Sequence, residues 1–193
     1  LSALINHINC HQARHIITLE DPIEYMHTPK KALIHQREIG RDVKDFNEGL
    51  RSILRQDPDV ILIGEMRDTE SIRLALTAAE TGHLVFSTLH ANSAAKTIHR
   101  IIDVFAGEDK ASIQALLAQN IEAIVSQELM QNNEGSLVAI SEILLATPAI
   151  RHLISENKIS QIGSVMQTQS ALGMQTREQH IEMLRKIGVI ACE

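Results

Sequence analysis

The stretch Asp59-Val60-Ile61-Leu62-Ile63-Gly64-Glu65-Met66-Arg67-Asp68 decides the fold of this chain. Its apolar run is short and rich in β-branched side chains, with Asp57-Pro58 before it and Gly64 after it. Such a run is typical of a strand that is covered on both faces. We therefore predict a central parallel strand over residues 60–63.

A carboxylate follows this strand directly, because Glu65 comes just after Gly64. In open α/β sheets, ligands bind beyond the carboxyl ends of the strands. In nucleotide hydrolases, an acidic residue at this place, called Walker B, faces Mg²⁺ or the attacking water. A buried strand that simply surfaces into a charged loop gives the same pattern, so the neighbouring segments have to decide.

Length and composition fit one good core with a small appended subdomain at most: the 193 residues are 44% hydrophobic and 22% charged. The net charge of -6 argues against nucleic-acid binding, which needs a basic surface. Cys10 and Cys192 show no CxxC spacing, which favours a reduced, cytoplasmic chain. No apolar run approaches the roughly 20 residues of a membrane helix, so we expect no direct membrane insertion.

Strand and helix patterns alternate along the first hundred residues. Residues 15–19 and 83–90 read as two more strands, and helical patterns begin at the candidate N-caps Asp45, Asp68 or Thr69, and Ser93. This alternation predicts a parallel sheet with right-handed crossovers. Residues 23–27 and 32–36, separated by a turn with Pro29, have the pattern of a hairpin.

The last quarter of the chain has a different character. From Thr147 on, the pattern is wholly helical, with Thr176 and Gln179 spaced as in a capping box. We therefore assign residues 1–146 to an α/β core and residues 147–193 to a helical C-terminal subdomain.

Three predicted strand ends carry polar residues: Glu20-Asp21 with Glu24, then Glu65, then His90. Because the carboxyl ends of parallel strands meet at one edge of a sheet, we expect these side chains to converge on one site. Such a site suits phosphoryl transfer, which has to hold a water and sense a terminal phosphate.

These segments resemble three motifs of the secretion ATPases: residues 18–24 resemble the Asp box, residues 64–68 the Walker B box, and residues 81–90 the His box. All three occur in the family's order and spacing. Within that superfamily, the chain is most similar to the type IV pilus retraction ATPases along essentially its whole length. The resemblance implies a RecA-like P-loop NTPase core.

The resemblance also implies roles for single residues. Glu24 and Glu65 would position or activate the attacking water, and His90 would contact the γ-phosphate of ATP. The nucleotide, Mg²⁺ and its water shell would be bound by a further set: Glu20, Asp21, His83 and Arg67. Each role has a plainer alternative, such as a surface carboxylate, turn chemistry before Pro22, or a structural histidine.

No resident metal ion beyond Mg²⁺ is expected. His83 and His90 lie seven residues apart in one predicted strand, which separates them by roughly 20 Å and points them to opposite faces. They therefore cannot share a zinc ion through that strand.

The resemblance implies a homohexamer in which a neighbour's arginine stabilises the transition state. Four arginines are candidates for this role in trans: Arg37, Arg51, Arg55 and Arg100. The implied partner is a pilus platform protein of the inner membrane. The chain would then lie in the cytoplasm and reach the membrane only through the pilus machinery.

The 193 residues contain no Walker A loop, which has the form GxxxxGK followed by Ser or Thr. In the family, this loop immediately precedes the helix whose spacing begins here with Leu1, Leu4 and Ile5. We therefore expect a fragment that starts just after that loop and that binds ATP weakly or not at all when alone.

Two other functions compete. Pilus-assembly and type II secretion ATPases of the same superfamily usually carry a tetracysteine zinc segment, which two isolated cysteines do not supply. A non-hydrolysing structural or regulatory ring subunit would have degraded motifs. Residues 149–156 resemble the retraction motif AIRNLIRE but depart from it at His152 and Ser155, which concerns force coupling more than hydrolysis.

Overall fold

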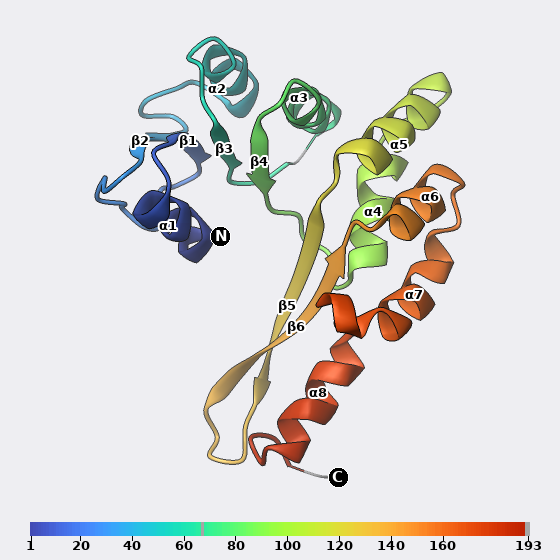
Figure 1. Cartoon of the computed structure of the whole chain (residues 1–193). Helices are drawn as coiled ribbons and strands as arrows, with labels where there is room; N and C mark the ends of the chain where they lie inside the picture. Colours follow the sequence, from blue (N-terminus) through green and yellow to red (C-terminus); the bar gives the residue numbers. More distant parts are fainter. Residues whose placement is uncertain (67, 192–193) are drawn as a thin grey trace. The chain divides into compact units, whose positions relative to one another are not determined.

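The computed structural model describes residues 1–66 and 68–191. The chain forms two compact units, Leu1–Leu89 and His90–Glu193. Figure 1 shows the elements of each unit along the chain. The domain boundary that we expected near Thr147 lies inside the second unit, and it stays a prediction.

The first unit contains a four-stranded sheet in the order β2-β1-β3-β4, in which all three pairs are parallel. Its strands are β1 (His15–Glu20), β2 (Leu33–Glu38), β3 (Val60–Ile63) and β4 (Leu84–Ser87). All four residues of β3 are buried, and β3 lies between β1 and β4. The prediction of a central parallel strand is confirmed.

Helices cover both faces of this sheet, as Figure 1 shows. The helices are α1 (Ser2–His11), α2 (Phe46–Ile53) and α3 (Thr69–Glu80). Side chains of α2 and α3 share one core with Ile17 and Ile61, whereas α1 shares another with Ile16 and Leu62 on the opposite face. The first unit is therefore a three-layer α/β/α structure.

The predicted N-caps of α2 and α3 are confirmed. The Asp45 carboxylate accepts a hydrogen bond from the backbone N–H of Glu48 at 2.8 Å, and the Asp68 carboxylate accepts one from Ser71 at 2.7 Å. Each bond satisfies a backbone donor that has no partner within the helix. Local sequence thus fixes where these helices begin.

Strand β3 is tied to β1 beyond both of its ends. Before β3, the Asp59 carboxylate accepts hydrogen bonds from the His15 backbone N–H at 2.8 Å and from Arg14 Nη1 at 2.7 Å. Both hydrogen bonds hold the pKa of Asp59 below its ordinary value, and the bond from the His15 backbone has the larger effect. After β3, the Gly64 N–H donates to Leu19 O at 2.7 Å.

The hairpin predicted for residues 23–27 and 32–36 is wrong. Strand β2 pairs in parallel with β1, with Leu33 opposite His15, and residues 23–27 form no strand. The Gln36 side chain holds this segment instead, since it donates to Tyr25 O at 2.9 Å and accepts from the His27 N–H at 2.7 Å. Hydrogen bonds to the Gln36 side chain thus hold the segment for which the prediction had backbone pairing between two antiparallel strands.

Strand β4 is shorter than the predicted run of residues 83–90. It covers only Leu84–Ser87, so His83 and His90 lie beyond its ends. His83 and His90 therefore do not share one strand, contrary to the prediction.

The second unit consists of an antiparallel pair of strands and several helices. Its elements are α4 (Ala94–Asp103), α5 (Glu108–Asn120), β5 (Ala123–Gln131), β6 (Leu137–Leu145), α6 (Pro148–Ser155), η1 (Ile159–Gln161), α7 (Ile162–Thr168), η2 (Ser170–Leu172) and α8 (Arg177–Lys186). The helical pattern after Thr147 and the capping box of Thr176 and Gln179 are confirmed. Among the described residues, no helix is both long and apolar enough to cross a bilayer.

Candidate functional site

The pairing of β1 with β3 brings two of the predicted acidic groups to one edge of the sheet. Leu19 lies opposite Ile63, so Glu20 and Glu65 follow at the carboxyl ends of neighbouring strands. Asp21 follows Glu20 and is exposed, whereas Glu65 is half-buried. The structure therefore places these three carboxylates at the edge where ligands of α/β sheets bind.

The Glu20 carboxylate is held in place by two donors. Thr18 Oγ1 donates to Glu20 Oε1 at 2.7 Å, and Gln36 Nε2 donates to the same oxygen at 3.0 Å. Since Thr18 is fully buried and both bonds fall on Oε1, the side chain has a fixed orientation. Oε2 then has lone pairs to offer a water molecule or a metal ion.

The backbone around Glu65 is held by residues that follow β4. Thr88 Oγ1 donates to Gly64 O, and the Met66 N–H donates to Thr88 O at 3.3 Å. These bonds hold the residues on both sides of Glu65. With the bond from the Gly64 N–H to Leu19 O, the backbone on both sides of Glu65 is thus bonded to residues at the ends of β1 and β4.

Glu24 lies in the loop that follows β1, where it is exposed. The Asp21–Pro22 peptide bond that begins this loop is cis. The next residue, Ile23, donates its N–H to Glu38 Oε2 at 3.2 Å, which ties the loop to the end of β2. Glu24 is therefore held near the same end of the sheet by its backbone.

His27 is a residue of this region that sequence reasoning missed. Its backbone is bonded to Gln36, and its Nε2 lies 3.5 Å from Ser2 Oγ. Burial lowers the pKa of His27, and the nearby Glu20 carboxylate opposes this shift. Within the described part of the chain, its buried Nδ1 has no hydrogen-bond partner. The sequence does place this histidine close to the Asp box, but residues 23–27 were predicted to be a strand, and His27 was given no role in the site.

The two histidines of the His box occupy different surroundings. His83 Nδ1 lies 2.9 Å from Ala78 O and 3.2 Å from Thr81 Oγ1, so this ring closes the end of α3. These contacts favour the structural interpretation of His83. His90 is the first residue of the second unit, is exposed, and accepts a hydrogen bond from Arg100 Nη1 on its carbonyl oxygen. Arg67 lies outside the described residues.

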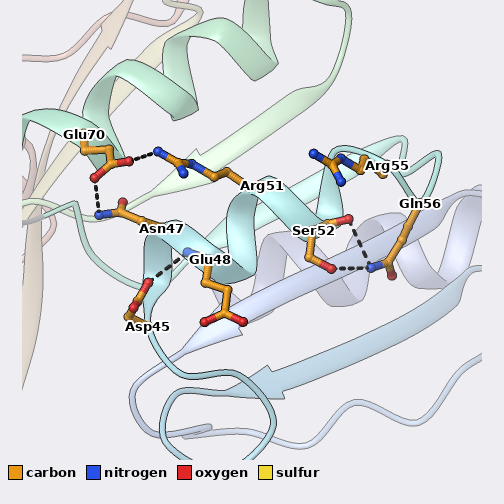
Figure 2. A pocket seen from close by; sticks show the side chains of 8 residues that line it. All are labelled: Asp45, Asn47, Glu48, Arg51, Ser52, Arg55, Gln56 and Glu70. Atoms are coloured by element: carbon orange, nitrogen blue, oxygen red, sulfur yellow. Dashed lines mark hydrogen bonds and ion pairs between the residues drawn. The ribbon is translucent and has the colours of Figure 1, made fainter.

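A pocket of about 740 Å³ lies elsewhere on the first unit (Figure 2). Its lining residues come from α2, the residues flanking it and the start of α3: Asp45, Asn47, Glu48, Arg51, Ser52, Arg55, Gln56 and Glu70. It contains none of the carboxylates of the strand ends. It does contain two of the four arginines predicted to act in trans.

Three of these four arginines are engaged within the chain. Arg51 pairs with Glu70, Arg37 Nη2 donates to Gln56 Oε1 at 2.5 Å, and Arg100 donates to the His90 carbonyl. Figure 2 shows the Arg55 guanidinium without such a bond to the other residues that are drawn. Of the four, Arg55 is the most available to a neighbouring molecule.

The segment that resembles the retraction motif forms α6 and is held by Arg151. This guanidinium donates to Ala146 O at 3.0 Å, to Ala118 O at 3.1 Å and to Glu122 Oε1 at 2.8 Å. The two departures from the motif, His152 and Ser155, are both exposed. They therefore change the surface of α6 and leave its packing intact.

Comparison with known proteins agrees with this arrangement. The family described as "Type II/IV secretion system protein" matches residues 1–187. The "Type IV pilus retractation ATPase PilT" of Pseudomonas aeruginosa is 52% identical over 100% of this chain and 56% of its own length. The "Twitching motility protein" of Neisseria gonorrhoeae is 54% identical over 100% of this chain and 52% of its own length.

A solved structure is similar as well. The one titled "Crystal Structure of the Pilus Retraction Motor PilT and Bound ADP" matches with a TM-score of 0.91 and 46% identity over 98% of this chain and 54% of that chain. The chain thus spans about half the length of the relatives it matches. The similarity confirms the predicted α/β, RecA-like core, and the chain belongs to the type II/IV secretion system protein family.

Proposed function

We propose that this chain supplies the hydrolytic part of an ATP-driven hexameric motor that retracts type IV pili. The observation that carries the proposal is the fixed placement of Glu20 and Glu65 at one sheet edge, in a chain similar to retraction motors along its whole length. Because the chain covers about half of those relatives, the activity is proposed for these residues joined to a Walker A loop.

In this proposal, the chain's carboxylates act on the attacking water. Glu65 or Glu24 accepts a hydrogen bond from the water, orients it and takes its proton as it attacks. His90 contacts the terminal phosphate and senses its loss. His83 and Arg67 are proposed to support nucleotide binding, the former by holding the turn between α3 and β4.

The residues at this edge fit a magnesium ion. Carboxylate oxygens such as Glu20 Oε2 and those of Asp21 are the hard ligands that Mg²⁺ prefers. The described residues hold no cluster of three metal-binding side chains, but Mg²⁺ at phosphoryl-transfer sites needs only one or two carboxylates beside phosphates and water. Bound with ATP, it would neutralise charge on the β- and γ-phosphates.

A ring supplies the remaining groups. We propose a homohexamer in which one of Arg37, Arg51, Arg55 and Arg100 reaches a neighbour's phosphates, with Arg55 favoured because its guanidinium makes no bond to the other pocket residues in Figure 2. The ring is proposed to work in the cytoplasm and to dock on the platform protein of the pilus in the inner membrane.

The test uses a hybrid in which residues 1–193 replace the matching part of the Pseudomonas aeruginosa relative. We expect Mg²⁺-dependent ATP hydrolysis that falls at least a hundredfold with Glu65→Gln, since proton transfer contributes roughly 10²–10⁴-fold. Glu80→Gln is the matched control, because Glu80 is exposed at the far end of α3. Twitching of cells that carry the hybrid then measures retraction.

Other outcomes contradict the proposal in distinct ways. A folded hexameric hybrid without turnover would favour the non-hydrolysing ring subunit. Turnover that restores pilus assembly but not retraction would favour an assembly ATPase. Equal turnover in the Glu65→Gln and Glu80→Gln variants would remove Glu65 from the reaction.

A further inference from the structure

Two histidines lie one helical turn apart on α1, outside the site described above. His7 and His11 are four residues apart, so they lie on the same side of the helix, and both are exposed. Their ring centroids are 4.4 Å apart, and the ring planes are inclined by 31°. The two imidazoles therefore lie side by side at the surface.

A backbone contact fixes the tautomer of one ring. His11 Nδ1 lies 2.7 Å from His7 O. Since a carbonyl oxygen only accepts, Nδ1 carries the hydrogen, and Nε2 of the neutral ring keeps its lone pair. Metal-binding histidines are commonly oriented in this way, with the other ring nitrogen donating to a backbone carbonyl.

We propose that His7 and His11 together bind a divalent transition metal ion such as Zn²⁺, with water completing the coordination shell. Two imidazoles on one ion, with metal–nitrogen distances of about 2.0–2.1 Å, place their ring centroids roughly 4.5–5 Å apart. The observed 4.4 Å is close to that separation. Nitrogen ligands select Zn²⁺, Cu²⁺ or Ni²⁺ over Mg²⁺, so this site is distinct from the proposed nucleotide site.

The neighbouring thiol is directed elsewhere. Lys30 Nζ donates to Cys10 Sγ at 3.2 Å, and Cys10 Sγ lies 3.9 Å from Asn6 Oδ1. Cys10 is therefore not counted as a third ligand, in line with the absence of any three-residue metal cluster among the described residues. A site with two protein ligands and open positions predicts micromolar rather than tighter affinity.

A second close histidine pair provides the matched control. His15 Nε2 and His35 Nδ1 are hydrogen-bonded to each other at 3.0 Å. His15 Nδ1 lies 3.2 Å from Asp57 O. Their nitrogens are engaged with each other and are not turned toward a common ligand. His35→Gln thus removes a histidine from a close pair without touching α1.

The experiment is calorimetric titration of Zn²⁺ into the 193-residue chain without an affinity tag, beside thermal unfolding with and without the ion. We expect one site whose affinity falls at least tenfold with His7→Gln and likewise with His11→Gln, together with loss of the metal-dependent rise in Tm. His35→Gln and Cys10→Ser should keep the affinity and the rise in Tm. The same titrations on the hybrid give a second, independent reading if the chain alone does not fold.

The contrary results are equally specific. Absence of saturable Zn²⁺ binding to the folded protein would overturn the proposal. So would binding that survives His7→Gln or His11→Gln, or that is lost with His35→Gln. None of these readings depends on ATP hydrolysis, so the metal site and the proposed function stand or fall separately.

Discussion

The backbone N–H of Gly64 donates to Leu19 O at 2.7 Å, and a Cβ added to Gly64 would lie only 3.1 Å from the same oxygen. The ends of β1 and β3 therefore lie close together, with little room for a side chain at Gly64. Glycine is favoured here by the limited space and not by its φ angle, which lies outside the left-handed region. Glu20 and Glu65 each adjoin this contact.

Gly64→Ala should accordingly lower the free energy of unfolding by about 1–3 kcal/mol, since overpacking against backbone atoms cannot be relieved by a rotamer change. Urea denaturation measures the effect. Gly163→Ala is the control, because a Cβ there meets nothing within 4 Å and lies in α7. That substitution should stabilise the chain by about 0.5–1 kcal/mol. Equal effects of the two changes would contradict this account of the strand ends.

Asn9 fastens the loop of residues 28–32 to α1. It is fully buried, its Nδ2 donates to Thr28 O at 2.9 Å, and its Oδ1 accepts from the Lys30 N–H at 2.8 Å. Asn9→Ala leaves both backbone groups without these partners, so we expect a loss of about 2 kcal/mol in the free energy of unfolding.

Asn6→Ala, one turn earlier on the same helix, is the comparison for Asn9→Ala. Its side chain makes only long polar contacts with the described residues, 3.5 Å to Lys30 Nζ and 3.9 Å to Cys10 Sγ. We expect an effect within about 0.5 kcal/mol. If Asn6→Ala lowered the free energy of unfolding as much as Asn9→Ala, the effect would come from a change within the helix and not from the lost attachment of the loop.

His27 should make the stability of the chain fall in mild acid. Its pKa is lowered by burial in the folded state, against 6.5 in the unfolded chain. As the pH falls below that value, the unfolded chain takes up a proton that the folded chain does not, so the free energy of unfolding decreases until the pH reaches the folded pKa.

Urea denaturation between about pH 7.5 and about pH 5.5 measures this dependence on His27. The slope should be smaller in His27→Gln and unchanged in His152→Gln, since His152 is exposed on α6. Identical slopes in His27→Gln and the parent chain would mean that another group carries the acid sensitivity.

The 193-residue chain alone should bind ATP weakly or not at all. It has the carboxylates of the strand ends but no GxxxxGK loop, whose backbone N–H groups and lysine make most contacts with the phosphates. Calorimetry of Mg²⁺–ATP with the chain and with the hybrid compares the two. Saturable micromolar binding by the chain alone would contradict the prediction.

Local signals made much of the fold predictable. The β-branched run before Gly64 predicted β3, and Asp45 and Asp68 predicted the starts of two helices, because these features act over a few residues. The hairpin prediction failed because the partner of β2 is β1, and that pairing depends on residues far apart in the sequence.

The same limit applies to the candidate site. The strand ends that carry Glu20 and Glu65 could be predicted, since parallel pairing follows from alternating strands and helices. The position of His27 could not, because it depends on a Gln36 side chain that reaches across from β2. The roles of Glu24 and His90 stay predictions.

The attachment of β3 to β1 at both ends limits the degrees of freedom available to Glu65. With Asp59 bonded to His15 on one side and Gly64 bonded to Leu19 on the other, β3 cannot slide along β1 without breaking hydrogen bonds at both ends. The separation between the carboxyl ends of the two strands, up to Gly64, is therefore set by backbone hydrogen bonds. Adjustments at this edge must come from side-chain rotation, or from the segment that follows Gly64.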